Sequence, residues 1–279
     1  MTRRAALWSV LALALILVVY SSAGRRSNAA AWTELASLAA PAEGEARPVL
    51  VELFTSEGCS SCPQADRLLI RLEQEQPVAG ALIVPMGFHV DYWNHLGWKD
   101  PFSSRAYSDR QYEYSQALGL NGVYTPQMVV DGRLEFVGSD SSEAASAISA
   151  AARAPKGRVT LEWDPPDAKG HLTTRVRVAS VPAGESAETV DVFLAVTESG
   201  LETSVARGEN AGRRLQHTAV VRRLARLGSH RQGAGELQHT ATVALDAGWN
   251  RQRLHLVAFA QERRGGRVVA VGMKSLATP

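Results

Sequence analysis

Two cysteines, Cys59 and Cys62, stand three positions apart and are the only cysteines in the 279-residue sequence. Residues 48–55 before them form a mostly apolar run typical of a buried strand, and residues 65–75 after them repeat leucines at helical spacing. Pro63 suits the first turn of that helix. Cys59 therefore stands just before a helix N-terminus, where unpaired N–H groups and the helix dipole lower a thiol pKa. The pattern predicts a redox-active pair.

The predicted chemistry is thiol–disulfide exchange. The N-terminal cysteine of such a pair is usually the exposed one, so we expect Cys59 to be the attacking thiolate and Cys62 to resolve the mixed disulfide. The redox-active disulfide is then the only predicted redox group, with no separate cofactor. The predicted partners are thiols or disulfides of other envelope proteins and an unidentified electron donor or acceptor. A non-catalytic binding or assembly protein with a structural disulfide is the alternative.

Metal binding is a lesser alternative, because metal sites use the same cysteine spacing. His89 or His95, together with Asp91, would complete a copper or zinc site with the cysteine pair. The sequence holds no second C-x-x-C, and these histidines do not have a standard ligand spacing. We therefore predict no metal ligand.

The segment from 46 to 155 predicts an α/β domain. After the first strand and helix we expect a strand at 81–90, a helix at 103–118, two strands within 123–138 and a helix at about 140–153. An Asp-Gly pair at 131–132 between the last two strands is a strong hairpin signal. The resulting order, β-α-β-α-β-β-α, resembles that of a thioredoxin-like domain. In that family a proline that begins the third strand is cis and lies beside the cysteine pair, and Thr125-Pro126 holds the matching place.

Three stretches, ELFTSEGCSSCPQAD, FHVDYWNHLGWKDPF and YTPQMVVDG, resemble a bacterial family of exported thioredoxin-like proteins known as domain of unknown function 1223. Residues 208–213 extend the resemblance into the C-terminal half of the chain. The resemblance implies that Pro126 shapes a groove for the substrate backbone, but the family name supplies no reaction. Ser60-Ser61 stands between the cysteines where thioredoxin has Gly-Pro, so the redox direction does not carry over.

Residues 88–102 hold five of the 18 aromatic residues of the chain. They predict a substrate platform around Trp93, with Thr125 beside it and His89 or His95 biasing the thiolate. A hydrophobic cluster that fastens a long loop is the equal alternative.

Glu52 lies in the first strand. It is a candidate proton acceptor buried near Cys62, as an acid is in thioredoxin. A solvent-exposed position at the strand edge is the alternative.

The N-terminal residues 1–31 have the layout of a secretory signal peptide. Basic residues precede an apolar run at 5–20, and small residues follow it. An uncleaved membrane anchor is the alternative, although the run is shorter than the ~20 residues that a spanning helix needs. We therefore predict an exported protein, periplasmic or secreted, with a linker at 32–45.

Charge divides the remaining chain into two segments. Residues 46–155 carry 8 basic and 13 acidic side chains, whereas residues 156–279 carry 18 basic and 12 acidic. The change of sign predicts a boundary between the thioredoxin-like domain and a C-terminal domain. Six or seven short apolar or alternating runs predict an all-β, sandwich-like C-terminal domain that serves as a binding module. Residues 218–227 fit a strand or a helix equally well.

Residues 207–231 contain seven arginines and one acid. These arginines predict docking on the acidic first domain, contact with an anionic envelope surface or acidic partner, or a solvated face. We predict no nucleic-acid partner, because aromatic residues do not interleave with the arginines. The candidate contact residues are Arg207, Arg213, Arg214, Arg222, Arg223 and Arg226.

Overall fold

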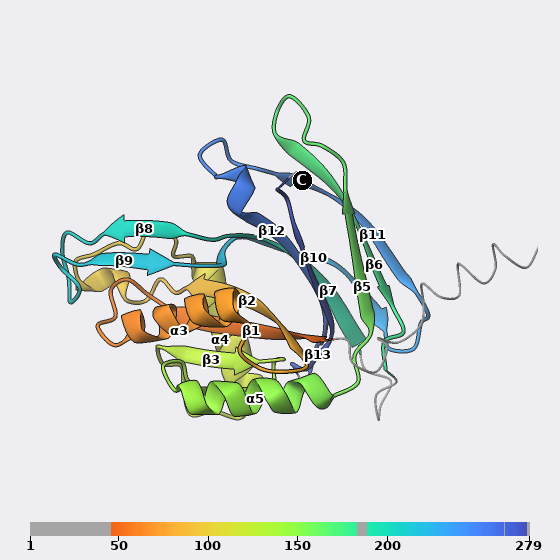
Figure 1. Ribbon diagram of the computed structural model, residues 1–279, viewed down its shortest axis with the longest axis horizontal. Helices are drawn as coiled ribbons and strands as arrows, with labels where there is room; N and C mark the ends of the chain where they lie inside the picture. The colour runs from red at the N-terminus through yellow and green to blue at the C-terminus, as the bar shows by residue number, and fades with distance from the viewer. Residues whose placement is uncertain (1–45, 183–188, 265, 278–279) are drawn as a thin grey trace, which may run out of the picture. The chain divides into compact units, whose positions relative to one another are not determined.

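The computed structural model describes residues 46–182, 189–264 and 266–277 (Figure 1). The predicted signal peptide at 1–31 and the predicted linker at 32–45 lie outside these residues. Within the described ranges, every helix is too short or too polar to cross a membrane.

Strands and helices alternate up to residue 153, and almost all regular structure after it is strand. The first part contains β1 (Arg47–Thr55), α3 (Cys62–Glu75), β2 (Ala81–His89), η1 (Asn94–Leu96), α4 (Arg105–Ala117), β3 (Gln127–Val130), β4 (Leu134–Val137) and α5 (Ser141–Arg153). The second part contains β5 (Arg158–Trp163), β6 (His171–Ala179), β7 (Thr189–Glu198), β8 (Leu201–Ser204), β9 (Arg214–His217), β10 (Val220–Arg231), β11 (Leu237–Ala244), η2 (Arg251–Arg253), β12 (Leu254–Glu262) and β13 (Val268–Ser275). The strand and helix order of the first part is the predicted one.

Local sequence explains how two of these helices begin. Pro63 stands in the first turn of α3, where its missing N–H costs no hydrogen bond. The Asp140 carboxylate caps α5 by accepting hydrogen bonds from the Ser142 and Glu143 N–H groups. Leucines of α3 and alanines of α5 form the buried faces of the two helices.

The predicted hairpin joins β3 and β4 through Asp131 and Gly132, both with positive φ (47° and 68°). Two consecutive positive φ values define the tight turn that suits antiparallel strands. A Cβ on Gly132 would lie 1.9 Å from the Gly266 carbonyl oxygen. Glycine is therefore required here both by conformation and by contact with the chain just before β13.

One eight-stranded mixed sheet contains strands from both parts of the chain, in the order β13-β12-β7-β10-β2-β1-β3-β4 (Figure 1). β1 pairs with β2 in parallel and with β3 in antiparallel orientation. The two parts join where β10 lies parallel to β2 at Val220 and Gly87. The Gly87 N–H donates to the Ala219 carbonyl over 2.8 Å. A side chain at position 87 would crowd this approach, since a Cβ would lie 3.2 Å from the Thr218 carbonyl oxygen.

A second sheet, in the order β11-β6-β5, packs on the C-terminal strands of the large sheet (Figure 1). Leu172 and Val176 of β6 share a buried cluster with Val192 of β7 and Leu256 of β12. This packing of sheet on sheet agrees with the predicted sandwich-like core. The ambiguous stretch at 218–227 lies mostly in a strand, β10.

A further core lies on the α4 side of the large sheet and belongs to both parts of the chain. Leu50 and Phe54 of β1 share it with Tyr114 of α4 and with Val257 and Phe259 of β12. The boundary predicted near residue 155 is thus crossed by one sheet and one hydrophobic cluster.

Candidate functional site

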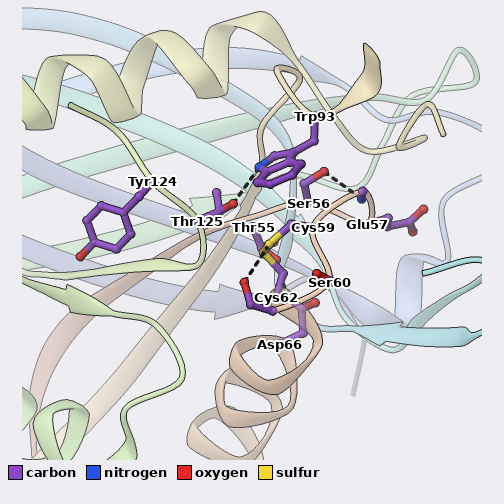
Figure 2. Close-up of a disulfide and its surroundings, with 12 residues drawn as sticks. Thr55, Ser56, Glu57, Cys59, Ser60, Cys62, Asp66, Trp93, Tyr124 and Thr125 are labelled. Atoms are coloured by element: carbon purple, nitrogen blue, oxygen red, sulfur yellow. Dashed lines mark hydrogen bonds between the residues drawn. A yellow bond between two sulfur atoms is a disulfide. The ribbon is translucent and has the colours of Figure 1, made fainter. Parts of the chain in front are cut away.

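Cys59 and Cys62 form a disulfide at the start of α3 (Figure 2). The loop from β1 brings the two residues together, because the Cys62 N–H donates to the Cys59 carbonyl over 3.2 Å. Ser60 and Ser61 are exposed, whereas Cys59 and Cys62 are 1% and 0% exposed. The prediction that Cys59 is the exposed sulfur is therefore wrong for the disulfide form, because distant side chains cover it.

Trp93 covers the disulfide from the segment after β2 (Figure 2). Its indole N–H donates to the Thr125 hydroxyl over 2.8 Å, which holds the ring across the site. Gly58 makes room for it, because a Cβ at that position would lie 3.1 Å from the Trp93 Cβ. Trp93 and Thr125 thus lie beside the cysteine pair, and their role in substrate binding stays a prediction.

Pro126 lies directly before β3, and the Thr125-Pro126 peptide bond is cis. This agrees with what the family resemblance implied. Pro126 faces α3 across Gly138, since a Cβ on Gly138 would lie 3.2 Å from Pro126 Cβ and 3.3 Å from Ala65 Cβ.

The loop between β8 and β9, residues 205–213, covers the other side of the cysteine loop. The Asn210 side-chain amide donates to the carbonyls of Glu57 and Cys59 over 2.8 and 3.0 Å. The Glu209 carboxylate accepts a hydrogen bond of 3.0 Å from the Ser60 N–H. Local sequence patterns did not predict these three hydrogen bonds. The signal for them was the resemblance of residues 208–213 to the family.

Buried ionisable groups lie behind the disulfide loop. Glu57 is fully buried and contacts the Trp98 indole N–H at 2.7 Å and His217 Nε2 at 3.1 Å. His89 Nδ1 contacts the Asp100 carboxylate at 2.7 Å. Burial opposes protonation of His89, but the carboxylates of Asp100, Asp66 and Glu57 together more than offset it, so the His89 pKa is raised. Burial opposes ionisation of Asp100, but His89 and two backbone N–H groups lower its pKa.

Asp66 belongs to the same group of side chains and lies one helical turn beyond Cys62 on α3 (Figure 2). Its carboxylate accepts a hydrogen bond of 2.8 Å from the Thr55 hydroxyl and lies 3.8 Å from His217 Nδ1. Burial raises the Asp66 pKa, although His217 and His89 act in the opposite direction. Sequence patterns did not identify Asp66, because it reads as an ordinary polar residue of an amphipathic helix.

Glu52 is not brought together with Cys62. Residues alternate between the two faces of a strand, so Glu52 points to the α4 side whereas Val51 and Leu53 pack with α3. It is fully buried, pairs with Arg110 at 2.7 Å and accepts a hydrogen bond from Tyr114. The predicted place beside Cys62 is therefore wrong, and so is the alternative of a solvent-exposed side chain.

The two histidines predicted for the site lie in different environments. His89 is buried, whereas His95 is exposed on η1 and its Nδ1 lies 2.7 Å from the Tyr92 carbonyl. Among the described residues no group of three or more His, Cys, Asp or Glu side chains is arranged so that it could hold a metal ion. Phe102 packs edge-on against His89 and His217, so the aromatic stretch at 88–102 fastens a long loop as well as covering the disulfide.

The arginines of residues 207–231 make several contacts within the protein. Arg214 pairs with Glu202, and Arg226 pairs with Asp191 at 3.5 Å. Arg222 lies 3.6 Å from Glu198 and stacks over Phe102, which belongs to the first part of the chain.

Fold and site together define a mixed α/β protein with a large mixed sheet and a C-x-x-C disulfide at the start of a helix. Residues 50–261 match the profile of a family described as "Protein of unknown function (DUF1223)". The chain belongs to this family.

Two solved structures resemble most of the chain. A protein from Agrobacterium tumefaciens is 26% identical, with a TM-score of 0.64 over 84% of this chain and 97% of that one. HBP35 of Porphyromonas gingivalis is 15% identical, with a TM-score of 0.60 over 84% and 81% of the two chains, and so shares the fold alone. None of the curated proteins compared with the chain matches it.

Proposed function

We propose that the protein is an exported thiol–disulfide oxidoreductase, or a redox partner, that acts on cysteines of other envelope proteins. The observation that carries this proposal is the Cys59–Cys62 disulfide at the first turn of α3, where N–H groups and the helix dipole stabilise a thiolate. The strand order β2-β1-β3-β4, with α3 and α5 on one face and α4 on the other, supports a thioredoxin-like unit within residues 46–155.

The exchange reaction proceeds in two steps. The Cys59 thiolate attacks one sulfur of a client disulfide, the client S–S bond breaks, and one client sulfur leaves as a thiolate. Cys62 then loses its proton and attacks the Cys59 sulfur, which forms the Cys59–Cys62 bond and releases the second client sulfur. Two electrons pass from the protein to the client. The reverse sequence oxidises a client dithiol, and the sequence between the cysteines does not decide the direction.

Access to the disulfide requires movement of its covers. Cys59 is 1% exposed, yet Ser60 and Ser61 beside it are at the surface. Trp93 and Asn210 cover the pair through side-chain hydrogen bonds of 2.8–3.0 Å. Trp93 is partly exposed and is held by one hydrogen bond, which contributes about 1 kcal/mol to stability, whereas Asn210 is fully buried and makes two hydrogen bonds to the cysteine loop. Trp93 is therefore the cover that a binding client displaces more easily.

A matched pair of variants tests the proposal. In Cys62→Ser the resolving sulfur is missing, so incubation with glutathione disulfide should accumulate a mixed disulfide at Cys59, seen by mass spectrometry. Cys59→Ser is the control. We expect it to react at least about tenfold more slowly, because Cys62 lies inside the first turn of α3 and is fully buried, whereas Cys59 lies on the loop before the helix. The proposal fails if both variants react equally, or if the pair in the unmodified protein resists reduction at about −270 mV, the potential of thioredoxin.

A structural disulfide is the second candidate, and the burial of both sulfur atoms favours it. A cross-link between positions three apart closes a very short loop, so the entropic stabilisation is only about 2 kcal/mol. Denaturation of the oxidised and reduced protein distinguishes the two roles. A loss of about 2 kcal/mol on reduction, without exchange with glutathione, favours the structural role.

The predicted signal peptide at 1–31 supports export, where a cysteine pair meets oxidising conditions. Cell fractionation of the full chain tests this part of the proposal, and recovery of an unprocessed chain in the cytoplasm would contradict it.

A further inference from the structure

The loop at residues 205–213 belongs to the C-terminal half of the chain but lies on the cysteine loop. Asn210 anchors it from within the protein: its side chain is fully buried and its amide donates to the carbonyls of Glu57 and Cys59. Arg213 holds the Asn210 amide in this orientation by donating to its oxygen over 3.0 Å. The position of the next side chain, Glu209, is therefore fixed relative to Cys59.

Glu209 places a carboxylate at the N-terminal edge of α3. Its Oε2 accepts a 3.0 Å hydrogen bond from the Ser60 N–H, the first backbone donor after Cys59. Hydrogen bonds from the Ser60 side chain and backbone hold the pKa of Glu209 below its usual range, so the carboxylate stays ionised at neutral pH. The N–H groups before a helix are the donors that would otherwise stabilise a thiolate on Cys59.

We propose that Glu209 sets the redox potential of the cysteine pair: its carboxylate occupies the Ser60 N–H and repels a thiolate on Cys59, which favours the disulfide over the dithiol. This inference rests on the proposed redox function. Glu209 is a positioning and electrostatic residue, since it acts through the Ser60 N–H and the field at Cys59. Reduction adds two electrons and two protons to the disulfide, and the proton that Cys59 then releases to solvent leaves the negative charge that Glu209 opposes.

Other charged groups surround the site, and a Glu209 variant contains the same ones. Arg213 lies on the same loop, Asp66 on α3, His217 on β9, and Glu57 on the loop before the cysteines. A difference between the protein and a Glu209 variant therefore reports the Glu209 charge.

The test uses Glu209→Gln in the full chain, because the glutamine oxygen still accepts from Ser60 while the charge is lost. The control is Glu143→Gln, which removes an exposed carboxylate from the first turn of another helix, α5. The Cys59 pKa is measured in the reduced proteins from the pH dependence of its alkylation by iodoacetamide. The reduction equilibrium with glutathione is measured at about pH 6 and about pH 9, on either side of the usual thiol pKa.

We expect Glu209→Gln to lower the Cys59 pKa by about 0.5–1, a modest shift because the carboxylate is solvent-exposed. At about pH 9 its dithiol should be favoured roughly three- to tenfold more than in the unmodified protein, a potential about 15–30 mV less negative. At about pH 6, below the usual thiol pKa, the two proteins should differ less. Glu143→Gln should match the unmodified protein at both pH values.

The outcomes separate this inference from the function on which it rests. If the pair reduces reversibly but Glu209→Gln leaves the Cys59 pKa and the equilibrium at about pH 9 unchanged, Glu209 does not set the potential. A shift of equal size at both pH values also overturns the inference, because it indicates a structural effect on the loop. If the pair cannot be reduced at all in either protein, the redox function fails and this inference fails with it.

Discussion

Two buried ionic networks lie on opposite faces of β1 and differ in their cations. On the α4 side, Glu52 pairs with Arg110 at 2.7 Å, and Tyr114 and Gln261 complete the hydrogen bonds. The Arg110 guanidinium also lies within 5.0–5.6 Å of the centres of four aromatic rings. Burial opposes the charge of Arg110, but the Glu52 carboxylate and other neighbours raise the Arg110 pKa overall, so the guanidinium stays charged at every working pH.

On the α3 side, behind the disulfide, histidines stand beside the carboxylates in place of an arginine. His89 faces Asp100 at 2.7 Å, and His217 lies between Glu57 at 3.1 Å and Asp66 at 3.8 Å. An imidazole changes its charge near neutral pH, whereas a guanidinium does not. The network far from the cysteines therefore has a cation of fixed charge, whereas the network beside them contains His89, whose charge depends on pH.

Replacing Arg110, the cation that stays charged, should have the largest effect on stability. Arg110→Met leaves the Glu52 carboxylate buried without its cation, so we expect the free energy of unfolding to fall by about 3–5 kcal/mol at all pH values from about 6 to 9. Denaturation in urea measures the change. The double variant Glu52→Gln with Arg110→Met should recover part of this loss, because no charge is left unpaired. A loss below about 1 kcal/mol in the single variant would show that the pair is not a fixed element.

Replacing His89, whose charge depends on pH, should have a smaller effect on stability, and this effect should vary with pH. The folded pKa of His89 is above its usual 6.5, so its protonation contributes stability that is complete below about pH 6.5 and is lost as pH rises through the raised pKa. His89→Gln keeps a donor toward Asp100 but cannot be protonated. We expect it to lose roughly 1–2 kcal/mol at about pH 6 and less at about pH 9. A loss that does not vary with pH would remove the contrast with Arg110.

Replacing Asp66 should have the smallest effect, and it should stabilise the protein rather than destabilise it. Burial raises its folded pKa above 3.8, so protonation of Asp66 contributes stability that is full below pH 3.8 and is lost as pH rises through the raised value. Asp66→Asn keeps an acceptor for the Thr55 hydroxyl and cannot ionise. We expect a gain of about 1 kcal/mol at about pH 7, and a smaller gain at about pH 4. Equal destabilisation at both pH values would show that His217 holds the Asp66 carboxylate in its ionised form.

Local patterns predicted the elements of the first part well. Apolar runs gave β1 and β2, the helical spacing of leucines gave α3, and the Asp131-Gly132 pair gave the turn between β3 and β4. These features depend on residues close in sequence, through side-chain periodicity and backbone preference. In the second part the same patterns predicted most strands but missed β8 and β9, which are four residues long and carry charged side chains.

Side-chain environments were predicted less well, because they depend on which face of a strand a residue occupies and on what packs there. Glu52 was placed beside Cys62, but strand alternation turns it toward Arg110 on the other face. Cys59 was expected to be exposed, but Trp93 and Asn210, 34 and 151 positions further along the chain, cover it.

The sequence by itself determined the cysteine pair, its place between a strand and the helix that begins at Cys62, and the order of the elements around it. These follow from interactions within a few turns or strands of the chain. Only the tertiary structure decided that β10 joins β2, that the loop bearing Glu209 and Asn210 lies on the cysteines, and that histidines rather than an arginine stand behind them. Such contacts join residues up to 160 positions apart, and no local periodicity specifies which of the many compatible surfaces will meet.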